Sequence, residues 1–586
     1  MRVIVLKFGS SVLRSEADLP RAIHEIYRWL RDGYSVVAVV SAFGKTTDQL
    51  LASAREYSDQ PPEGALALLL STGEKRAAAL LALALDRAGI PASAFDPSRL
   101  GLRTSGRVLN AEPVRLNVGA IRKALDNSRV AVVPGFIGQM QDGRTSLLGR
   151  GGSDLSALFL AVHLRGRCRL LKDVDGVYDH DPHVSAARCY ASLTWKDALA
   201  IGGRIIQQKA LRFSREHSQS FEVAALGAEQ ATIVGAESTA YFPSRAKRDR
   251  VRVALLGLGT VGYGVYQELA AQPEFFETVG IAVRNLHRPE QKVPQSLLST
   301  DVWDVVNRDC DVVIEVLGGI QPAADCIKSA LLAGKHVVTA NKAALANHPE
   351  LHEIVEARGS QLLCSAAVGG AVPVLETLRR LAGQHEIDTV EGVLNGTTNF
   401  ILHELARGIP FDQAVAQAQA CGLAEADPSA DLDGSDVACK LVLIARAAFG
   451  VDLPFASVHR VGITEVDPRH VFDLSKSGSA VRLVGSLRRD GDGIIAEVKP
   501  VVLEAAHSLA NTDREENCVM VKITSGETHI LHGKGAGRWP TTEAVFADLS
   551  NLLRGWRRFV ESDEQERSAK IAIAAAVGTG EEVLAL

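Results

Sequence analysis

The feature that most restricts the fold of this chain is a glycine-rich turn at 257–262, which reads GLGTVG. An apolar run, VRVALL, precedes the turn, and a helical pattern follows it as far as Ala271. A strand, a tight turn and a helix in this order are typical of a Rossmann domain, where the helix N-terminus holds the phosphates of a dinucleotide. The sequence therefore predicts a parallel sheet with a dinucleotide site at this turn.

Each glycine of the turn has a separate expected task. Gly257 permits the sharp turn, Gly259 lets the pyrophosphate approach the backbone, and Gly262 allows the helix to pack closely on the strand. The alternative is a glycine-rich turn that binds no ligand. The strand and helix on either side favour the dinucleotide interpretation.

The strands that follow the turn carry polar residues at their ends. The strand at 279–283 ends in Arg284, where an NAD site would carry Asp or Glu, so the sequence favours the 2′-phosphate of NADP. A third predicted strand ends at Gly318. A fourth predicted strand lies in HVVTANK at 336–342, and Asn341 and Lys342 follow its carboxyl end. The carboxyl edge of such a sheet faces the ligand, so these residues are expected near it.

Apolar strand-like runs alternate with helical patterns along most of the chain, which predicts layered α/β domains with largely parallel sheets. The clearest domain boundary is the basic stretch PSRAKRDR at 243–250, which we interpret as a linker. A helix-rich region is expected at about 410–450, and further strands at 480–535. The clearest strand predictions are 3–7, 35–41, 130–135, 251–257 and 311–319.

Charge and cysteine content exclude several classes of partner. The 586 residues carry 64 basic and 69 acidic side chains, a net charge of −5, so no cationic excess indicates nucleic acid or a membrane surface. An early apolar stretch, 77–85, is far shorter than the ~20 residues that cross a bilayer, and Lys7 interrupts the N-terminal apolar run. Eight Cys without a CxxC pair indicate reduced thiols. We expect a cytoplasmic protein whose partners are small molecules.

A second group of charged residues lies in GLAEADPSADLDGSDVACK at 422–440. Calcium binding is the obvious alternative, but the spacing lacks the ligand order of an EF-hand. Asp436 and Lys440 are four residues apart at the start of a helical run, so they share one helix face. An ordinary surface ion pair would have the same local pattern.

Five motifs of the C-terminal half occur together in one order: GLGTVG, TANKAAL, NGTTNFIL, the 425–440 segment and GKGAGRWPTTEAVFADL. They make the stretch from Val251 to about Leu552 similar to homoserine dehydrogenase. The resemblance implies reversible reduction of aspartate 4-semialdehyde to homoserine by NADPH. It also implies a homo-oligomer, because the family is usually dimeric.

The same resemblance assigns roles to individual side chains. Glu425 and Asp436 would meet the amino group of the substrate, and Lys342 and Lys440 would act in catalysis. This is chemically sensible, because hydride arriving at an aldehyde leaves negative charge that an ammonium group stabilises or protonates. The catalytic group implied is Lys342, Asp436 and Lys440, and the implied NADP(H) contacts are Gly257, Gly259, Thr260, Val261, Gly262, Arg284, Gly318, Asn341, Gly422 and Gly535.

The loop CSAAVGGAVPV at 364–374 resembles the family's loop for a monovalent cation, Na⁺ or K⁺. Ser365 stands where the family usually has Glu. The oxygens that remain for a cation are the backbone carbonyls of Val368, Gly370 and Val372.

The N-terminal half carries another set of phosphate-binding features. Lys7 and Gly9 follow the first predicted strand, so backbone amides and an ammonium group can reach phosphates. The turn GRGGSD at 149–154 opens a helix and presents an Arg suited to carboxylate recognition. LLKDVDGVYDHDP at 170–182 ends a strand in an acidic loop.

Together with KFGSSV, VVSAFGKTTDQLL, STGEK and VPGFIGQ, these motifs make residues 1 to about 235 similar to aspartate kinase. The resemblance implies phosphoryl transfer from ATP, with Mg²⁺, to the side-chain carboxylate of aspartate. Lys7 would stabilise the transferring phosphoryl group, and Asp154 would organise the catalytic lysine. Aspartate would be held by Thr47, Glu74, Arg150 and Ser153, and nucleotide by Gly9, Ser10, Lys172, Asp173 and Tyr178.

This half departs from the family at several positions. KFGSSV replaces KFGGTSV, GGRIIQQ at 202–208 replaces GAKVLHP, and Lys172 replaces a small hydroxyl residue. Because Lys7, Glu74, Arg150 and Asp154 remain, we expect an active kinase. The alternatives are a dehydrogenase whose kinase-like half is weakened, or only binds ligand or scaffolds an oligomer, and a kinase for another acid such as glutamate.

The motifs nearly fill the chain and predict an α/β kinase domain followed by a Rossmann domain and an α+β catalytic domain. No room remains between the two enzymes for the ACT regulatory modules of bifunctional relatives, which need at least ~50 residues each. Feedback inhibition through such modules is therefore expected to be absent. The predicted divisions are a kinase domain at 1–235, a linker at 236–250, an NADP-binding domain at 251–375, a substrate and dimerisation domain at 376–535, and a closing segment with a helical tail at 536–586.

Overall fold

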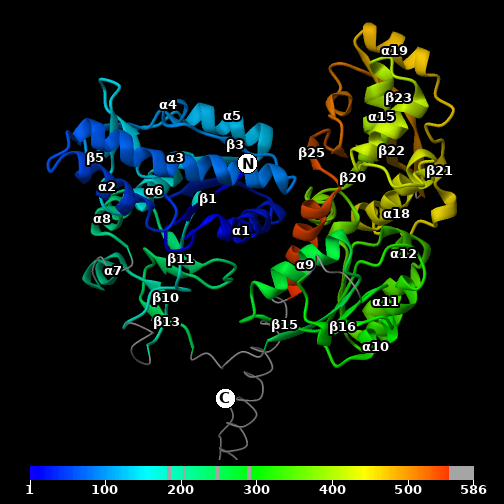
Figure 1. Cartoon of the computed structure of the whole chain (residues 1–586), viewed down its shortest axis with the longest axis horizontal. Helices are drawn as coiled ribbons and strands as arrows, with labels where there is room; N and C mark the ends of the chain where they lie inside the picture. Colours follow the sequence, from blue (N-terminus) through cyan, green and yellow to red (C-terminus); the bar gives the residue numbers. More distant parts are fainter. Residues whose placement is uncertain (181–186, 202–205, 244–249, 287–291, 492, 553–586) are drawn as a thin grey trace, which may run out of the picture.

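The computed structural model describes residues 1–586 except 181–186, 202–205, 244–249, 287–291, 492 and 553–586. Sheets at 2–241, 251–363 and 387–534 organise the chain, with the first sheet at the left of Figure 1 and the others at the right. Arg204, most of the basic stretch of the predicted linker and most of the predicted tail lie outside the described residues.

The N-terminal sheet has the strand order β13-β10-β12-β11-β9-β1-β2-β6-β3, and β1 pairs in parallel with both β2 and β9. Side chains of β1 alternate between two apolar layers, Ile4 facing one and Val5 the other, because helices cover both faces of the sheet. The strands are β1 (Arg2–Phe8), β2 (Tyr34–Val40), β3 (Ser93–Ala94), β6 (Val130–Pro134), β9 (Arg167–Lys172), β10 (Tyr190–Leu193), β11 (Phe221–Ala225), β12 (Thr232–Val234) and β13 (Ala240–Tyr241).

Helices α1 (Leu19–Arg31) and α3 (Glu63–Arg87) pack on one face of this sheet, and α6 (Gly152–Leu164) packs on the other. A small sheet of order β5-β4-β7-β8 lies beside it. The remaining elements are α2 (Thr46–Tyr57), α4 (Pro97–Leu100), α5 (Val118–Ser128), α7 (Trp195–Ile201), α8 (Gln208–Glu216), β4 (Arg103–Arg107), β5 (Asn110–Arg115), β7 (Ile137–Gln139) and β8 (Thr145–Leu147).

The second sheet has the order β16-β15-β14-β17-β18-β19, and all of its strand pairs are parallel, as the sequence predicts for a Rossmann domain. Its strands are β14 (Val251–Leu256), β15 (Phe276–Ala282), β16 (Leu298–Ser299), β17 (Val312–Glu315), β18 (His336–Thr339) and β19 (Leu362–Leu363). The helices are α9 (Thr260–Ala270), α10 (Val302–Asn307), α11 (Ala323–Leu332), α12 (Lys342–Asn347) and α13 (Glu350–Arg358), followed by η3 (Ser365–Ala367).

The third sheet has the order β21-β23-β22-β20-β24-β25 and is antiparallel except at β21. Its strands are β20 (Ile387–Val393), β21 (His459–Arg460), β22 (Ser479–Asp490), β23 (Gly493–Glu504), β24 (Glu516–Ile523) and β25 (Thr528–Lys534). The helices are α14 (Val374–Ala382), α15 (Gly396–Ala406), α16 (Phe411–Ala420), α17 (Ser429–Leu432), α18 (Ser435–Phe449) and α19 (Pro468–Lys476), and residues 538–552 form a helix after β25.

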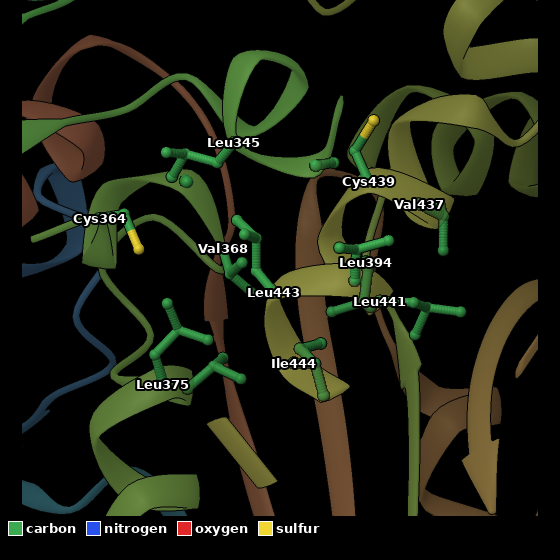
Figure 2. Packing of buried hydrophobic residues seen from close by; sticks show 14 of the residues in the cluster. Leu345, Cys364, Val368, Leu375, Leu394, Val437, Cys439, Leu441, Leu443 and Ile444 are labelled. Atoms are coloured by element: carbon green, nitrogen blue, oxygen red, sulfur yellow. The ribbon is translucent and has the colours of Figure 1, made fainter. Parts of the chain in front are cut away.

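Helix α18 joins the second and third sheets into one apolar core. Figure 2 shows Leu441 beside Leu394 at the end of β20, and Leu443 beside Val368. These residues belong to one buried cluster that also includes side chains of β14, β17 and β18. Because α18 is apolar on almost every side, its packing in this core fixes the position of its first two turns, which carry Asp436 and Lys440.

The predicted fold class and the strands expected from apolar runs are confirmed. Within the described ranges, none of the helices combines the length and apolar character required to cross a bilayer. All eight cysteines have free thiols, and six of them are buried.

Candidate active sites

The candidate phosphoryl-transfer site lies at the carboxyl ends of the parallel strands β1, β2, β6 and β9. Lys7 is near the end of β1, Lys172 ends β9, and Asp154 stands in the first turn of α6. Ligands bind at this edge of open α/β sheets, because strand ends and helix N-termini converge there.

Asp154 binds two lysines at the centre of this site. Lys7 Nζ lies 2.8 Å from one carboxylate oxygen, and Lys172 Nζ lies 2.9 Å from the other. Burial alone would raise the pKa of Asp154, but the two ammonium groups outweigh burial and lower the pKa to about 2. Burial lowers the pKa of the Lys7 ammonium, against the attraction of Asp154. The cluster places two lysine side chains where a phosphoryl group would carry negative charge.

Neighbouring residues leave space around the Lys7 ammonium. A side chain on Gly9 would place its Cβ only 2.8 Å from Lys7 Nζ, so any larger residue there would shift the lysine. Ser153 packs against Gly135 just beyond β6. Glu74 of α3 is buried and accepts a hydrogen bond from the Ala42 amide at 3.3 Å, and burial raises its pKa to about 7.

Other predicted kinase residues lie on the rim of this edge. Ser10, Arg150 and Asp173 are exposed, and Thr47 is half-buried in α2. The Tyr178 hydroxyl donates a hydrogen bond to Asp175 at 2.5 Å, which fixes the acidic loop after β9. The structure therefore brings Lys7, Asp154 and Lys172 into direct contact and arranges the exposed residues around them.

The glycine turn has the geometry that a dinucleotide requires. Gly257 has a φ of +105°, and a Cβ there would lie 2.7 Å from the Val316 carbonyl. A Cβ on Gly262 would lie 2.0 Å from the Gly257 carbonyl, so only glycine lets α9 pack this closely. Gly259 and Thr260 are exposed at the start of α9, and a Cβ on Gly259 would meet open space. That open space is where a pyrophosphate would approach.

Glu315, at the end of β17, is a site residue that the sequence analysis missed. It is fully buried and accepts hydrogen bonds from the Leu317 amide at 2.8 Å, the Thr339 hydroxyl at 2.5 Å and Asn341 Nδ2 at 3.3 Å. Burial raises its pKa, although these donors oppose the shift. The Glu315 carboxylate thereby connects the turn after β17, through Leu317, with the end of β18, through Thr339 and Asn341. A lone acid within the apolar run VVIEVL was the signal available in the sequence.

The remaining predicted cofactor residues of this sheet surround that turn. Asn341 caps α12 by accepting from the Ala344 amide at 3.0 Å, and it donates to the Gly319 carbonyl at 2.7 Å. Gly318 has a φ of +76°. Arg284 is exposed just beyond β15, the strand next to the glycine turn in the sheet.

Asp436 is enclosed by two lysines from different parts of the chain. Lys440, one turn along α18, lies 2.7 Å from Asp436 Oδ2, and Lys342 of α12 lies 3.0 Å from Oδ1. Burial alone would raise the pKa of Asp436, but the two ammonium groups hold it well below its ordinary range. Asp436 in turn raises the pKa of Lys342. The pattern seen in the sequence is therefore a cluster that bridges the second and third sheets, in which Lys440 is buried and Lys342 is partly exposed.

Asn395 completes this cluster and was also missed as a site residue. Its Nδ2 donates to Asp436 at 2.9 Å and to Asp431 at 2.6 Å, and Lys440 donates to the carbonyl of Leu394. Burial and the nearby Asp436 raise the pKa of Asp431. Asn395 opens the motif NGTTNFIL and caps α15, so its side chain was indicated only as a helix cap.

Three other predicted residues lie outside this cluster of direct contacts. Glu425 and Gly422 are exposed in the loop after α16. Gly535 follows β25 and packs so tightly on Asn517 that a Cβ would lie 1.9 Å from its amide nitrogen.

The predicted cation loop contacts the N-terminal half of the chain. The Val372 carbonyl accepts from the Val374 amide at 2.8 Å, and the Gly370 carbonyl accepts from the Tyr27 hydroxyl at 3.5 Å. Ser365 bonds to Asp548 through its amide at 2.8 Å and its hydroxyl at 2.7 Å. Among the described residues, no group of three or more His, Cys, Asp or Glu side chains is arranged to hold a metal ion.

Comparisons with known proteins agree with this division of the chain. The model of the amino acid kinase family matches residues 2–224. The models "Homoserine dehydrogenase, NAD binding domain" and "Homoserine dehydrogenase" match 257–364 and 373–550. Only residues 225–256 separate the kinase match from the dehydrogenase matches.

Individual relatives cover the C-terminal half. The homoserine dehydrogenase of Synechocystis sp. is 35% identical over 318 residues, which are 52% of this chain and 73% of that protein. The Bacillus subtilis homoserine dehydrogenase is 35% identical over 320 residues, 52% of this chain and 74% of that protein. The crystal structure of a homoserine dehydrogenase from Thiobacillus denitrificans is 36% identical, with a TM-score of 0.50, and the match covers 52% of this chain and 74% of that one.

The glycine turn on a parallel sheet and the Lys–Asp–Lys cluster define the C-terminal half as an NAD(P)-binding dehydrogenase. The chain belongs to the homoserine dehydrogenase family, and an amino acid kinase domain precedes the dehydrogenase in the same polypeptide.

Proposed function

We propose that the C-terminal half reduces aspartate 4-semialdehyde to L-homoserine with NADPH. The observation that carries this proposal is the Lys342–Asp436–Lys440 cluster at the carboxyl edge of the dinucleotide-binding sheet. NADPH would supply a hydride, and its pyrophosphate would lie at Gly259 and the exposed N-terminus of α9.

Each residue of the cluster has a distinct proposed task. Lys440 donates a proton to the substrate oxygen as negative charge develops there. Lys342, whose pKa is raised by Asp436, stays protonated and supplies lasting positive charge. Asp436 aligns both ammonium groups, and Asn395 orients its carboxylate. Glu425 would meet the substrate amino group from the exposed loop.

We propose NADPH rather than NADH as the preferred cofactor because of Arg284. Arg284 lies just beyond β15, where the ribose of the adenosine half binds in this fold, and the described residues 283–286 at that strand end include no acid. The test is the ratio of kcat/KM for NADPH to that for NADH before and after Arg284→Asp. A ratio that Arg284→Asp leaves unchanged would remove Arg284 from this role.

We propose that the N-terminal half phosphorylates L-aspartate with MgATP. Lys7 and Lys172 on either side of Asp154 support phosphoryl transfer, because that chemistry depends on positioning and charge neutralisation. Glu74 would pair with the aspartate ammonium and Arg150 with a carboxylate.

The decisive experiment measures ADP release by the purified chain with aspartate and MgATP, with Lys7→Ala as the control. Turnover well above that of Lys7→Ala is expected. Turnover equal to it would favour the second candidate, a dehydrogenase whose N-terminal half binds ligand or scaffolds an oligomer. That candidate is supported by Lys172 at a position where the kinase family usually has a small hydroxyl residue. A hydroxamate assay with aspartate and glutamate separates the two acceptor acids.

We propose the domain division expected from the sequence, with the kinase domain at 1–235, the linker at 236–250 and the dehydrogenase beyond it. We also propose a cytoplasmic homo-oligomer that associates through the dehydrogenase half. A monovalent cation at the carbonyls of Val368, Gly370 and Val372 stays a prediction, which activity with and without Na⁺ or K⁺ tests.

A further inference from the structure

One face of α1, in the kinase half, carries polar side chains that are buried against the dehydrogenase half. His24, Tyr27 and Arg31 are spaced by three and four residues, so they line up along one side of the helix. Figure 1 shows α1 facing α9 and the helical residues 538–552. These three residues, called here the polar stripe of α1, thus contact elements more than 200 residues away in the chain.

His24 lies between two carboxylates that belong to the dehydrogenase. Its Nδ1 is 2.5 Å from Glu543, its Nε2 is 3.5 Å from Glu268, and its ring stacks on Phe546 at 4.4 Å. Burial alone would lower the pKa of His24, but the two acids outweigh burial and raise the pKa to about 10. The two carboxylates therefore favour the protonated form of the imidazole.

Arg31 lies between a second pair of buried acids. Its guanidinium is 2.7 Å from Glu376 and 2.6 Å from Asp548, and it donates to the Ser365 hydroxyl at 3.0 Å. All four acids of the two pairs belong to the dehydrogenase half, and α1 supplies one cation to each pair. Two carboxylates buried together repel each other, so losing the α1 cation would destabilise each pair. Arg379 of the dehydrogenase half still attracts Glu376, so the dependence on α1 is greatest at Glu268 and Glu543.

The first pair is linked to the dinucleotide site through α9, since Glu268 lies near the C-terminal end of the helix whose N-terminus follows the glycine turn. Glu543 is on the neighbouring helical segment 538–552. The two helices touch, because a Cβ on Gly264 would lie 2.5 Å from the Thr542 hydroxyl. Without the imidazole, Glu268 and Glu543 would repel each other or one of them would take up a proton, and either change would disturb the contact between these helices and the position of the α9 N-terminus.

We propose that α1 is a built-in brace of the dehydrogenase, in which His24 and Arg31 are positioning residues for the dinucleotide site. This inference rests on the proposed NADPH-dependent function. The kinase half then strengthens cofactor binding by the other half, whether or not it turns over aspartate.

The test measures the Kd for NADPH by its fluorescence in the full-length chain, so it does not depend on turnover. We expect His24→Leu to raise that Kd tenfold or more, with the kcat at saturating NADPH within threefold of the unsubstituted chain. Adding Glu268→Gln to His24→Leu removes one stranded acid and is expected to recover most of the lost affinity. If His24→Leu does not fold, Arg31→Met with and without Asp548→Asn provides the same comparison.

The matched control is Arg28→Met on the same helix, because Arg28 pairs with Glu25 and the Ala228 carbonyl within the kinase half. It is expected to leave the Kd for NADPH unchanged. The brace is wrong if His24→Leu binds NADPH as the unsubstituted chain does, or if Arg28→Met weakens binding equally. A chain that binds NADPH but does not oxidise homoserine would refute the proposed function and leave this test intact.

Discussion

Replacing Lys440 with methionine tests the proposed chemistry of the dehydrogenase most directly. Methionine keeps most of the side-chain length but removes the ammonium that lies 2.7 Å from Asp436 and donates to the Leu394 carbonyl. The substitution leaves Lys342 and Asn395 beside Asp436, so the carboxylate keeps partners. The expected loss is therefore mainly catalytic.

The magnitude follows from the two tasks assigned to Lys440. General acid catalysis contributes about 10²–10⁴-fold, and losing one donor to a developing oxyanion costs about 10²–10³-fold. One ammonium performs both tasks, so the effects overlap and we expect kcat to fall about 10³-fold, or about 4 kcal/mol. The unpaired Leu394 carbonyl adds a loss of about 1–3 kcal/mol in the free energy of unfolding.

The assay is steady-state homoserine oxidation and semialdehyde reduction, with NADPH binding measured separately by fluorescence. NADPH affinity is expected to stay within about threefold, because Lys440 lies on α18 and the glycine turn lies on α9. Lys342→Met is the matched comparison, and a smaller loss of about 10–100-fold is expected because it removes charge without removing the proton donor. Retention of kcat within tenfold in Lys440→Met, or an equal loss of NADPH binding, would refute the assignment.

Three further predictions concern the cofactor turn, its supporting acid and the kinase half. Gly262→Ala is expected to lower both NADPH affinity and the thermal midpoint, because its Cβ would lie 2.0 Å from the Gly257 carbonyl. Gly259→Ala should lower NADPH affinity alone, because its Cβ meets open space. Equal thermal midpoints of the two variants would contradict this prediction. Glu315→Gln places an NH₂ group where three hydrogen-bond donors converge. It should raise the Kd for NADPH about tenfold and lower the free energy of unfolding by about 1–3 kcal/mol. Unchanged NADPH titration and unfolding curves would contradict this prediction. Burial raises the pKa of Glu74 to about 7, so the carboxylate that would bind the aspartate ammonium forms as the pH rises. The KM for aspartate should therefore fall about tenfold between pH 6 and 8 in the unsubstituted chain but not in Glu74→Gln. A KM that does not change with pH in the unsubstituted chain would exclude Glu74 from this contact.

Local pattern sufficed for the features that depend on neighbours in the chain. Apolar runs predicted the strands, the glycine spacing predicted the turn before α9, and a separation of four residues predicted that Asp436 and Lys440 share a helix face. Burial of that pair could not be predicted, because it depends on Lys342 arriving from another strand end and on the apolar packing of α18.

The missed residues are ones whose partners are remote. Asn395 is an ordinary helix cap until Asp431 and Asp436 fold back onto it from 36 and 41 residues away. Glu315 is an isolated acid until Thr339 and Asn341 reach it from the next strand. Periodicity carries no information about such contacts, because they are set by how elements pack rather than by how each one forms.

The polar stripe of α1 gives a physical reason for one departure from the dehydrogenase family. Ser365 stands where that family usually has Glu, and from sequence this is only a lost charge. In the fold the position already has Glu376 and Asp548 beside it, with Arg31 as their cation. A third carboxylate there would add another buried negative charge beside Glu376 and Asp548, whereas the serine hydroxyl both accepts from Arg31 and donates to Asp548. Serine at 365 and arginine at 31 are thus explained together, each by the contact between the two halves, and neither residue has this explanation in a dehydrogenase that lacks the kinase helix.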